Sequence, residues 1–130
     1  MRSLKLGLTA APWYHERSRA GIPPEAGWQI GQAGSVREGT WVRFGLRLTG
    51  RRIVDARYEV FGCPAAIAAA AWTAQRVVGA APAAVASLHG RTIAELLALP
   101  VEKTGVALVV EDAVRAALAA AGLLVGQGIE

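Results

Sequence analysis

The sequence is short of cysteine, and this shortage excludes several classes of protein. Its 130 residues contain a single cysteine, Cys63. One thiol cannot form an internal disulfide, and no stretch combines a basic start, an apolar middle and a small-residue cleavage site. We therefore expect a cytoplasmic protein. The sequence also lacks a Cys-x-x-Cys pair, a His-Glu-x-x-His pattern, a glycine-rich phosphate loop and a hydrolase signature.

Long apolar runs and dense basic runs are missing as well. Charged and polar side chains interrupt each apolar stretch before it reaches the roughly 18 residues of a membrane span. The formal net charge is +4, but lysine and arginine are scattered along the chain. We expect no membrane insertion and no nucleic-acid partner.

The residues that are present predict one α+β domain over 1–130. Hydrophobic residues make up 53% of the chain, enough for one core. The pattern divides the chain into an N-terminal segment (1–27), a β-meander (28–62) and a helical half (63–122). The predicted fold is a small antiparallel meander of about three strands, followed by helices that pack on one of its faces.

The predicted strands come from alternation. Four residues share the buried face of the first clear strand: Val42, Phe44, Leu46 and Leu48. After a turn at 49–52, four more share the buried face of the next: Val54, Ala56, Tyr58 and Val60. The glycine-rich run 27–34 adds a third strand. On the opposite face, Arg43 and Arg47 are expected to pair with Asp55 or Glu59.

The predicted helices begin after Gly62, where the apolar period lengthens to about 3.6. Pro64 and Gly79 suit the first turn and the end of one helix. A short turn follows at 82–88, then a helix that starts at a capping box of Thr92 and Glu95 and is closed by Pro100. The last helix covers 104–121, with Glu111 and Arg115 paired one turn apart. Its predicted buried stripe consists of Val106, Val109, Val110, Ala113, Val114, Ala117 and Leu118.

Cys63 falls where the last strand meets the first long helix. Free backbone amides and the positive end of the helix dipole favour a thiolate at this N-cap. A thiolate is both a metal ligand and a nucleophile. The alternative is a small buried side chain that fills the corner between sheet and helix.

Three tryptophans also have two interpretations, contact surface or core packing: Trp13, Trp28 and Trp41.

The segment around this cysteine, VDARYEVFGCPAAIAAA, resembles the signature of the U-type iron-sulfur cluster assembly scaffolds, the IscU and NifU N-terminal family. The later segment LPVEKTGVALVVEDAVRAAL is similar to the family's closing segment, and YHERSRAG is loosely similar to its N-terminal region. The resemblance covers nearly the whole chain. It implies a non-enzymatic scaffold that binds iron or an iron-sulfur cluster.

The chain departs from the family at the ligand positions. The family holds its cluster with three cysteines and an aspartate or histidine. By alignment, Glu38 stands at the first cysteine, Thr40 at the aspartate, and Gly105 and Val106 at the His-Cys pair. Cys63 is the retained ligand, and Glu38 offers a hard oxygen donor. This ligand set is incomplete within one chain. A homodimer, a small thiol or a partner protein would have to complete it.

Two functions remain open at this point. The first is a scaffold-like carrier in which Cys63 accepts iron, a cluster or persulfide sulfur. The second is a degenerate scaffold that binds a partner, a cysteine desulfurase or a chaperone of cluster assembly, without holding a cluster. Pro100 and Lys103 belong to a segment that resembles the family's chaperone-recognition loop. His15 and His89 are expected to be surface or turn residues rather than ligands, and an independent thiol enzyme is disfavoured.

Overall fold

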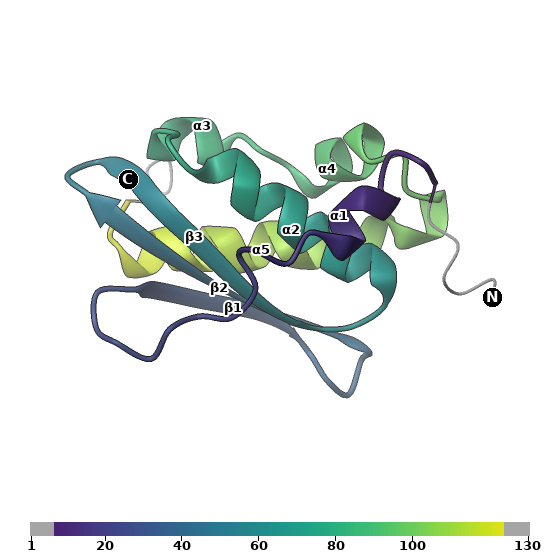
Figure 1. Cartoon of the computed structure of the whole chain (residues 1–130), viewed down its shortest axis with the longest axis horizontal. Coiled ribbons are helices and arrows are strands. Elements are labelled where there is room, and N and C mark those ends of the chain that lie inside the picture. Colours follow the sequence, from purple (N-terminus) through teal and green to yellow (C-terminus); the bar gives the residue numbers. More distant parts are fainter. Residues whose placement is uncertain (1–6, 124–130) are drawn as a thin grey trace.

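The sheet of this protein is a three-stranded antiparallel meander, as predicted. The computed structural model describes residues 7–123. Strands β1 (Gln29–Ser35), β2 (Thr40–Thr49) and β3 (Arg52–Phe61) lie in the order β1-β2-β3. The helices are α1 (Ala11–His15), α2 (Pro64–Val77), α3 (Pro82–Ala86), α4 (Gly90–Leu96), the 3-10 turn η2 (Val101–Lys103) and α5 (Thr104–Ala120). Figure 1 shows the helices on one side of the sheet. The α+β prediction is confirmed.

Small side chains let the two long helices approach the sheet closely. The side of α2 that faces the core is made almost entirely of buried alanines. In α5 the backbone itself rests on β1. A Cβ at Gly31 would overlap the backbone nitrogen of Ala117 and lie 2.6 Å from the carbonyl oxygen of Ala113. Only glycine fits there, so α5 is fixed along β1.

The predicted faces of the strands hold for β2 and for most of β3. Val42, Phe44 and Leu46 are fully buried in the core. The prediction for Val54 is wrong, because this side chain is 45% exposed and Ile53 is buried in its place. The register shifts between Arg47↔Asp55 and Leu48↔Ile53, so Val54 is the extra residue of a β-bulge.

The predicted cross-strand ion pairs are half right. Arg43 binds Glu59 at 3.0 Å. Arg47 lies opposite Asp55 in the sheet but is 3.6 Å from Glu25 instead. Asp55 is bound at 2.8 Å by Arg19 from the N-terminal segment. Strand alternation identifies which residues face each other across the sheet. The ion-pair partners of Arg47 and Asp55 come instead from the N-terminal segment that covers the sheet.

The helix boundaries were predicted well, but the capping box was not. α4 begins at Gly90, so Thr92 lies inside the helix and caps nothing. The N–H of Gly90 donates to Glu111 Oε1 of α5 at 2.7 Å. The predicted stripe of α5 also needs one correction, since Ala107 is fully buried and Val106 and Val109 are only partly buried.

The N-terminal segment closes the outer edge of β3. Tyr58 N–H donates to the carbonyl of Arg19 at 3.1 Å, and Gly21 N–H donates to the carbonyl of Tyr58 at 2.7 Å. The Tyr58 hydroxyl also donates to the carbonyl of Glu16 at 3.1 Å. These bonds satisfy edge groups that would otherwise be free to pair with another chain.

Candidate functional site

Cys63 occupies the N-cap of α2, as the sequence predicted. Its backbone is extended (φ −80°, ψ 170°), and Pro64 follows as the first helical residue. The carbonyl of Cys63 accepts hydrogen bonds from the amides of Ala66 and Ile67, at 3.0 and 3.2 Å. Its thiol is free and makes no capping hydrogen bond, and the residue as a whole is partly buried. Both interpretations of Cys63, reactive thiolate and small side chain filling the corner, are compatible with this position.

Three segments meet around this cysteine. A Cβ on Gly62 would lie 3.7 Å from both the carbonyl of Gly39 and the methyl of Thr40, which places the turn between β1 and β2 beside Cys63. A Cβ on Gly34 would lie 2.9 Å from the side chain of Val109, which places the first half of α5 at the same end of the sheet. Figure 1 shows this turn, the junction of β3 with α2 and the start of α5 at one end of the molecule.

The structure therefore groups the segments that carry the predicted ligand positions. Glu38 is exposed in the turn, where its amide is bound at 3.1 Å by Ser35 Oγ. Thr40 and Val106 are partly buried, and Gly105 has open space around it. Within residues 7–123, no three His, Cys, Asp or Glu side chains gather to hold a metal ion. The corner offers one thiol and a nearby carboxylate-bearing turn.

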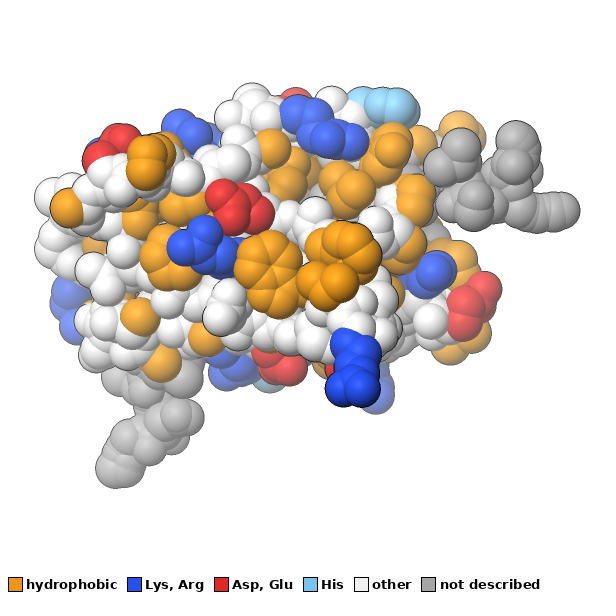
Figure 2. Space-filling model, turned by 90° about the horizontal axis from the view of Figure 1, so that it is seen from below, with side chains coloured by type: hydrophobic (Ala, Val, Ile, Leu, Met, Phe, Trp, Pro, Cys, Tyr) orange, Lys and Arg blue, Asp and Glu red, His pale blue; other side chains and the backbone are white. Residues whose placement is uncertain are grey.

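Two aromatic side chains lie on the sheet just before Cys63. Trp41 and Phe61 face each other across β2 and β3, and Phe61 is 49% exposed. Figure 2 looks at the strand side of the molecule and shows hydrophobic groups gathered near the middle, with basic groups beside them. Trp28 is covered instead by the guanidinium of Arg47, 4.6 Å from its ring centre, and Trp13 packs against the core.

The loop with Pro100 and Lys103 is accessible to a partner. Pro100 is exposed and precedes η2, whose Val101 is 84% exposed, whereas Lys103 is partly buried. A groove of about 490 Å³ lies beside the loop, between α4 and the start of α5. Its lining consists of Arg91, Ala94, Glu95, Ala98, Leu99, Val101 and Thr104.

Glu111, predicted as a surface carboxylate, joins α4 to α5. Glu111 is only 13% exposed and accepts hydrogen bonds from Gly90 N–H at 2.7 Å and Arg115 Nε at 2.8 Å. Burial acts to raise the pKa of Glu111, but these bonds and one from His89 outweigh it and hold the pKa below its usual value. The i, i+4 spacing of Glu111 and Arg115 predicted their ion pair. No local sequence signal predicted the hydrogen bond between Glu111 and the amide of Gly90.

Among residues 7–123, neither histidine forms a hydrogen bond or an ion pair with Cys63. His89 is the exposed N-cap of α4, with Nδ1 3.5 Å from Glu111. His15 ends α1, exposed, with its ring against Tyr14. These placements agree with the prediction of surface or turn residues.

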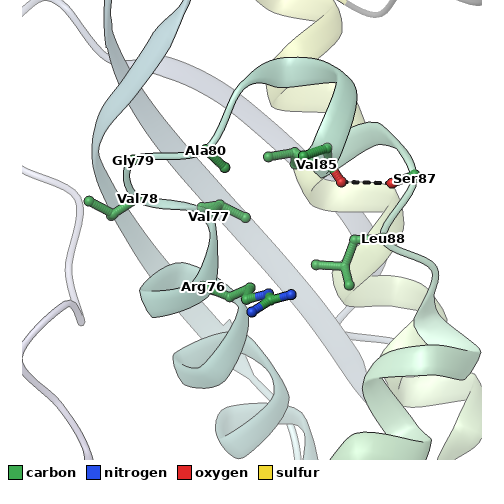
Figure 3. A pocket seen from close by; sticks show the side chains of 9 residues that line it. Arg76, Val77, Val78, Gly79, Ala80, Val85, Ser87 and Leu88 are labelled. Carbon is green, nitrogen blue, oxygen red and sulfur yellow. Dashed lines mark hydrogen bonds between the residues drawn. The ribbon is translucent and has the colours of Figure 1, made fainter.

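A further hollow of about 410 Å³ lies at the other end of α2 from Cys63. Figure 3 shows Arg76 reaching toward Leu88 across its floor, with Val77 and Val85 on its walls. The Ser87 hydroxyl at its rim donates to the carbonyl of Ala84 at 2.9 Å. This hollow has one charged side chain and none of the predicted site residues.

Solved structures show which fold this chain shares. An N-terminal NifU-like protein from Brucella abortus has a TM-score of 0.73 and 16% identity, over 88% of this chain and 92% of the other. A putative iron-sulfur cluster assembly scaffold protein for the SUF system from Fervidobacterium islandicum has a TM-score of 0.67 and 13% identity, over 82% and 91%. These likenesses show a shared α+β fold.

The sequence defines the family. Residues 12–121 match the model of the NifU-like N terminal domain. The chain therefore belongs to this family. Iron-sulfur cluster assembly protein 1 of Arabidopsis thaliana is 39% identical over 67 residues, 52% of this chain and 40% of the plant protein. The iron-sulfur cluster assembly enzyme IscU of Drosophila melanogaster is 38% identical over 68 residues, 52% and 44%. The matched part thus spans about two fifths of these relatives.

Among the described residues, none of the helices combines the length and apolarity that crossing a membrane requires.

Proposed function

We propose that this protein is a scaffold-like carrier in iron-sulfur cluster assembly and that Cys63 is its point of attachment for iron, a cluster or sulfur. The observation that carries the proposal is the free, only partly buried Cys63 at the start of α2 in a chain of the NifU-like family. The proposal assigns the chain no catalytic turnover of its own.

Two reactions are available to a thiolate at this corner. It can bind an iron ion directly, with Glu38 as a hard oxygen donor from the neighbouring turn. It can also attack the outer sulfur of a donor's cysteine persulfide. The donor S–S bond then breaks, the donor cysteine leaves as a thiolate, and Cys63 carries the persulfide. In the second case a cysteine desulfurase would supply the sulfur. The helix N-terminus favours the anionic sulfur in both reactions.

One thiol does not complete the coordination of a cluster, so the proposal includes an outside ligand. A second copy's Cys63, a small thiol or a partner protein would supply it. The exposed loop with Pro100 and Lys103, beside the groove between α4 and α5, is the proposed contact for a chaperone of cluster assembly.

The second candidate function is partner binding without a cluster. It is favoured by the residues that stand at the remaining ligand positions, Thr40, Gly105 and Val106. None of these has a thiolate or imidazole to offer iron. Such a chain would keep the fold and its docking surfaces and would regulate assembly through them.

Reconstitution separates the two candidates. Under anaerobic conditions with ferrous iron, sulfide and glutathione, we expect a visible charge-transfer absorption from the wild-type chain. Cys63→Ser should abolish the absorption, whereas Ser87→Ala, far along the chain, should retain it. The iron content per chain measures whether two chains share one cluster. A wild-type chain that stays colourless and iron-free leaves only the partner-binding function.

A further inference from the structure

The two edges of the sheet are treated differently. The edge of β3 is covered at two points: residues 19–21 exchange backbone hydrogen bonds with Tyr58, and residues 79–80 exchange them with Ile53. The edge of β1 has no such cover. In the described part of the chain, the backbone of β1 is paired with β2 alone, and no other backbone hydrogen bond reaches Gln29–Ser35. The strand order leaves β1 as the open edge.

β1 also lacks the features that usually protect an open edge. Natural edge strands carry charges, prolines or bulges that discourage a further strand. The sequence of β1, QIGQAGS, has neither charge nor proline. Its register with β2 runs unbroken from Gln29 to Ser35, and the backbone leaves the extended region at Gly34, whose φ is +79°, so the regular part of the edge is 29–33. Gln32 and Gly34 are exposed. The edge is therefore suited to accept another extended segment.

α5 restricts what the edge of β1 can accept. The helix follows β1 along its length, because Gly31 lies against Ala113 and Ala117, and Gly34 lies against Val109. Two β1 strands paired about a two-fold axis would be about 4.8 Å apart. Such pairing would bring two α5 helices side by side, and packed helices need roughly 8–10 Å between axes. An extended peptide carries no helix and meets no such requirement.

We propose that the free edge of β1 binds an extended peptide of a partner protein, which adds a fourth strand to the sheet. Main-chain hydrogen bonds to β1 provide the affinity, as in other cases of strand addition. Because α5 lies close over β1, the peptide carries small residues on the side that faces the helix.

The charge of the peptide follows from Asp112. This carboxylate is exposed, and within residues 7–123 it makes no ion pair. It precedes Ala113, whose carbonyl lies against Gly31 of β1. A lysine or arginine in the added strand would therefore find a carboxylate on the helix above it. The partner segment is extended, small on one face and basic.

A titration with the acetylated and amidated peptide Lys-Thr-Ala-Val-Ala-Thr-Lys tests the proposal, because its two lysines and two alanines share the face that would lie toward α5. In two-dimensional 15N NMR, we expect the largest shift changes at the backbone amides of Gln29–Ser35. Amides of β1 should also gain protection from hydrogen exchange. Asp112→Lys should weaken binding about two- to five-fold, as expected for one exposed ion pair. Glu95→Lys on α4 is the matched charge control and should leave the affinity unchanged.

A second peptide with glutamate in place of both lysines reverses the charge. It should bind the wild type more weakly and recover affinity with Asp112→Lys. The proposal is overturned if millimolar peptide leaves the β1 amides unshifted, if the changes lie on β3 or at Trp41 instead, or if sedimentation shows that β1 pairs two copies. Cys63→Ser should bind the peptide as the wild type does, so this result is independent of the proposed carrier function.

Discussion

The N-termini of α2 and α4 both lack a capping hydrogen bond from their own N-cap side chain, but they differ in what binds their free amides. α2 begins after Cys63 and α4 after His89, and neither N-cap side chain bonds its own helix. At α4 a carboxylate from another helix takes the place of the cap, since Glu111 accepts the hydrogen bond of Gly90. At α2 no side chain takes that place. The comparison separates a helix N-terminus bound by a carboxylate from one that no described side chain caps.

The largest expected effect on this comparison comes from a substitution at Gly90, the first residue of α4. A Cβ at Gly90 would lie 2.7 Å from Leu108 Cα and 2.8 Å from the carbonyl of Ala107. Because these atoms are backbone, Gly90→Ala must push α4 off α5. We expect a loss of about 3 kcal/mol in the free energy of unfolding, measured by urea denaturation.

Gly105→Ala is the matched control. Gly105 also stands in the first turn of a helix, but no atom lies within 4 Å of its added Cβ. This variant should gain about 0.5–1 kcal/mol through helix propensity. Equal effects at the two glycines would contradict the tight contact between α4 and α5.

Removing the charge of Glu111 should have the next largest effect. Glu111→Gln loses the charge-assisted bonds with Arg115 and Gly90, and we expect it to cost about 2 kcal/mol. The pKa of Glu111 is held below its usual 4.5, so its stabilisation is fully present above that pH. It is lost as the pH falls through the lowered folded-state pKa.

Urea denaturation of the wild type and Glu111→Gln from pH 7 to pH 3 measures this dependence. The difference between the two proteins should be constant near neutrality and shrink in acid. The exposed Glu95→Gln on α4 should change the stability by less than about 0.5 kcal/mol at every pH. A difference between wild type and Glu111→Gln that grows in acid would contradict the predicted sign.

The smallest effect concerns the start of α2. If this N-terminus accepts an anion, Cys63→Asp should be more stable than Cys63→Ala by about 1 kcal/mol, because aspartate is a good N-cap and complements the helix dipole. Thermal unfolding measures the difference. The charge part of the gain should weaken in 1 M salt. Equal stabilities would show that Cys63 stands at an end where a negative group gains nothing.

Local sequence patterns predicted most of the fold. Alternation identified the strands, and proline and glycine placed the ends of α2. The errors arose where segments distant in the sequence determine the local structure or the bonding partner. The bulge at Val54 and the partner of Arg47 depend on how the turn and the covering loop pack, and the cap of α4 comes from Glu111, 21 residues beyond Gly90. A spacing rule that looks a few residues ahead does not reach these contacts.

For the candidate site, the change in period placed Cys63 at the strand-to-helix junction, and the structure agrees with this position. The partial burial of Cys63 required coordinates. The grouping of the β1–β2 turn and the first half of α5 with Cys63 depends on how the three segments pack, since they lie far apart in the chain. The open edge of β1 needed the strand order and the position of α5 together.

The closure of β3 by residues 19–21 has a consequence for biosynthesis. The ribosome makes this segment before the strands, whereas Tyr58, its binding partner, is translated only with the last strand, β3. Residues 19–21 must therefore dock late. A nascent chain that stops before Phe61 would expose a strand edge without its backbone partners. A chaperone that binds nascent chains would protect the edge at this stage.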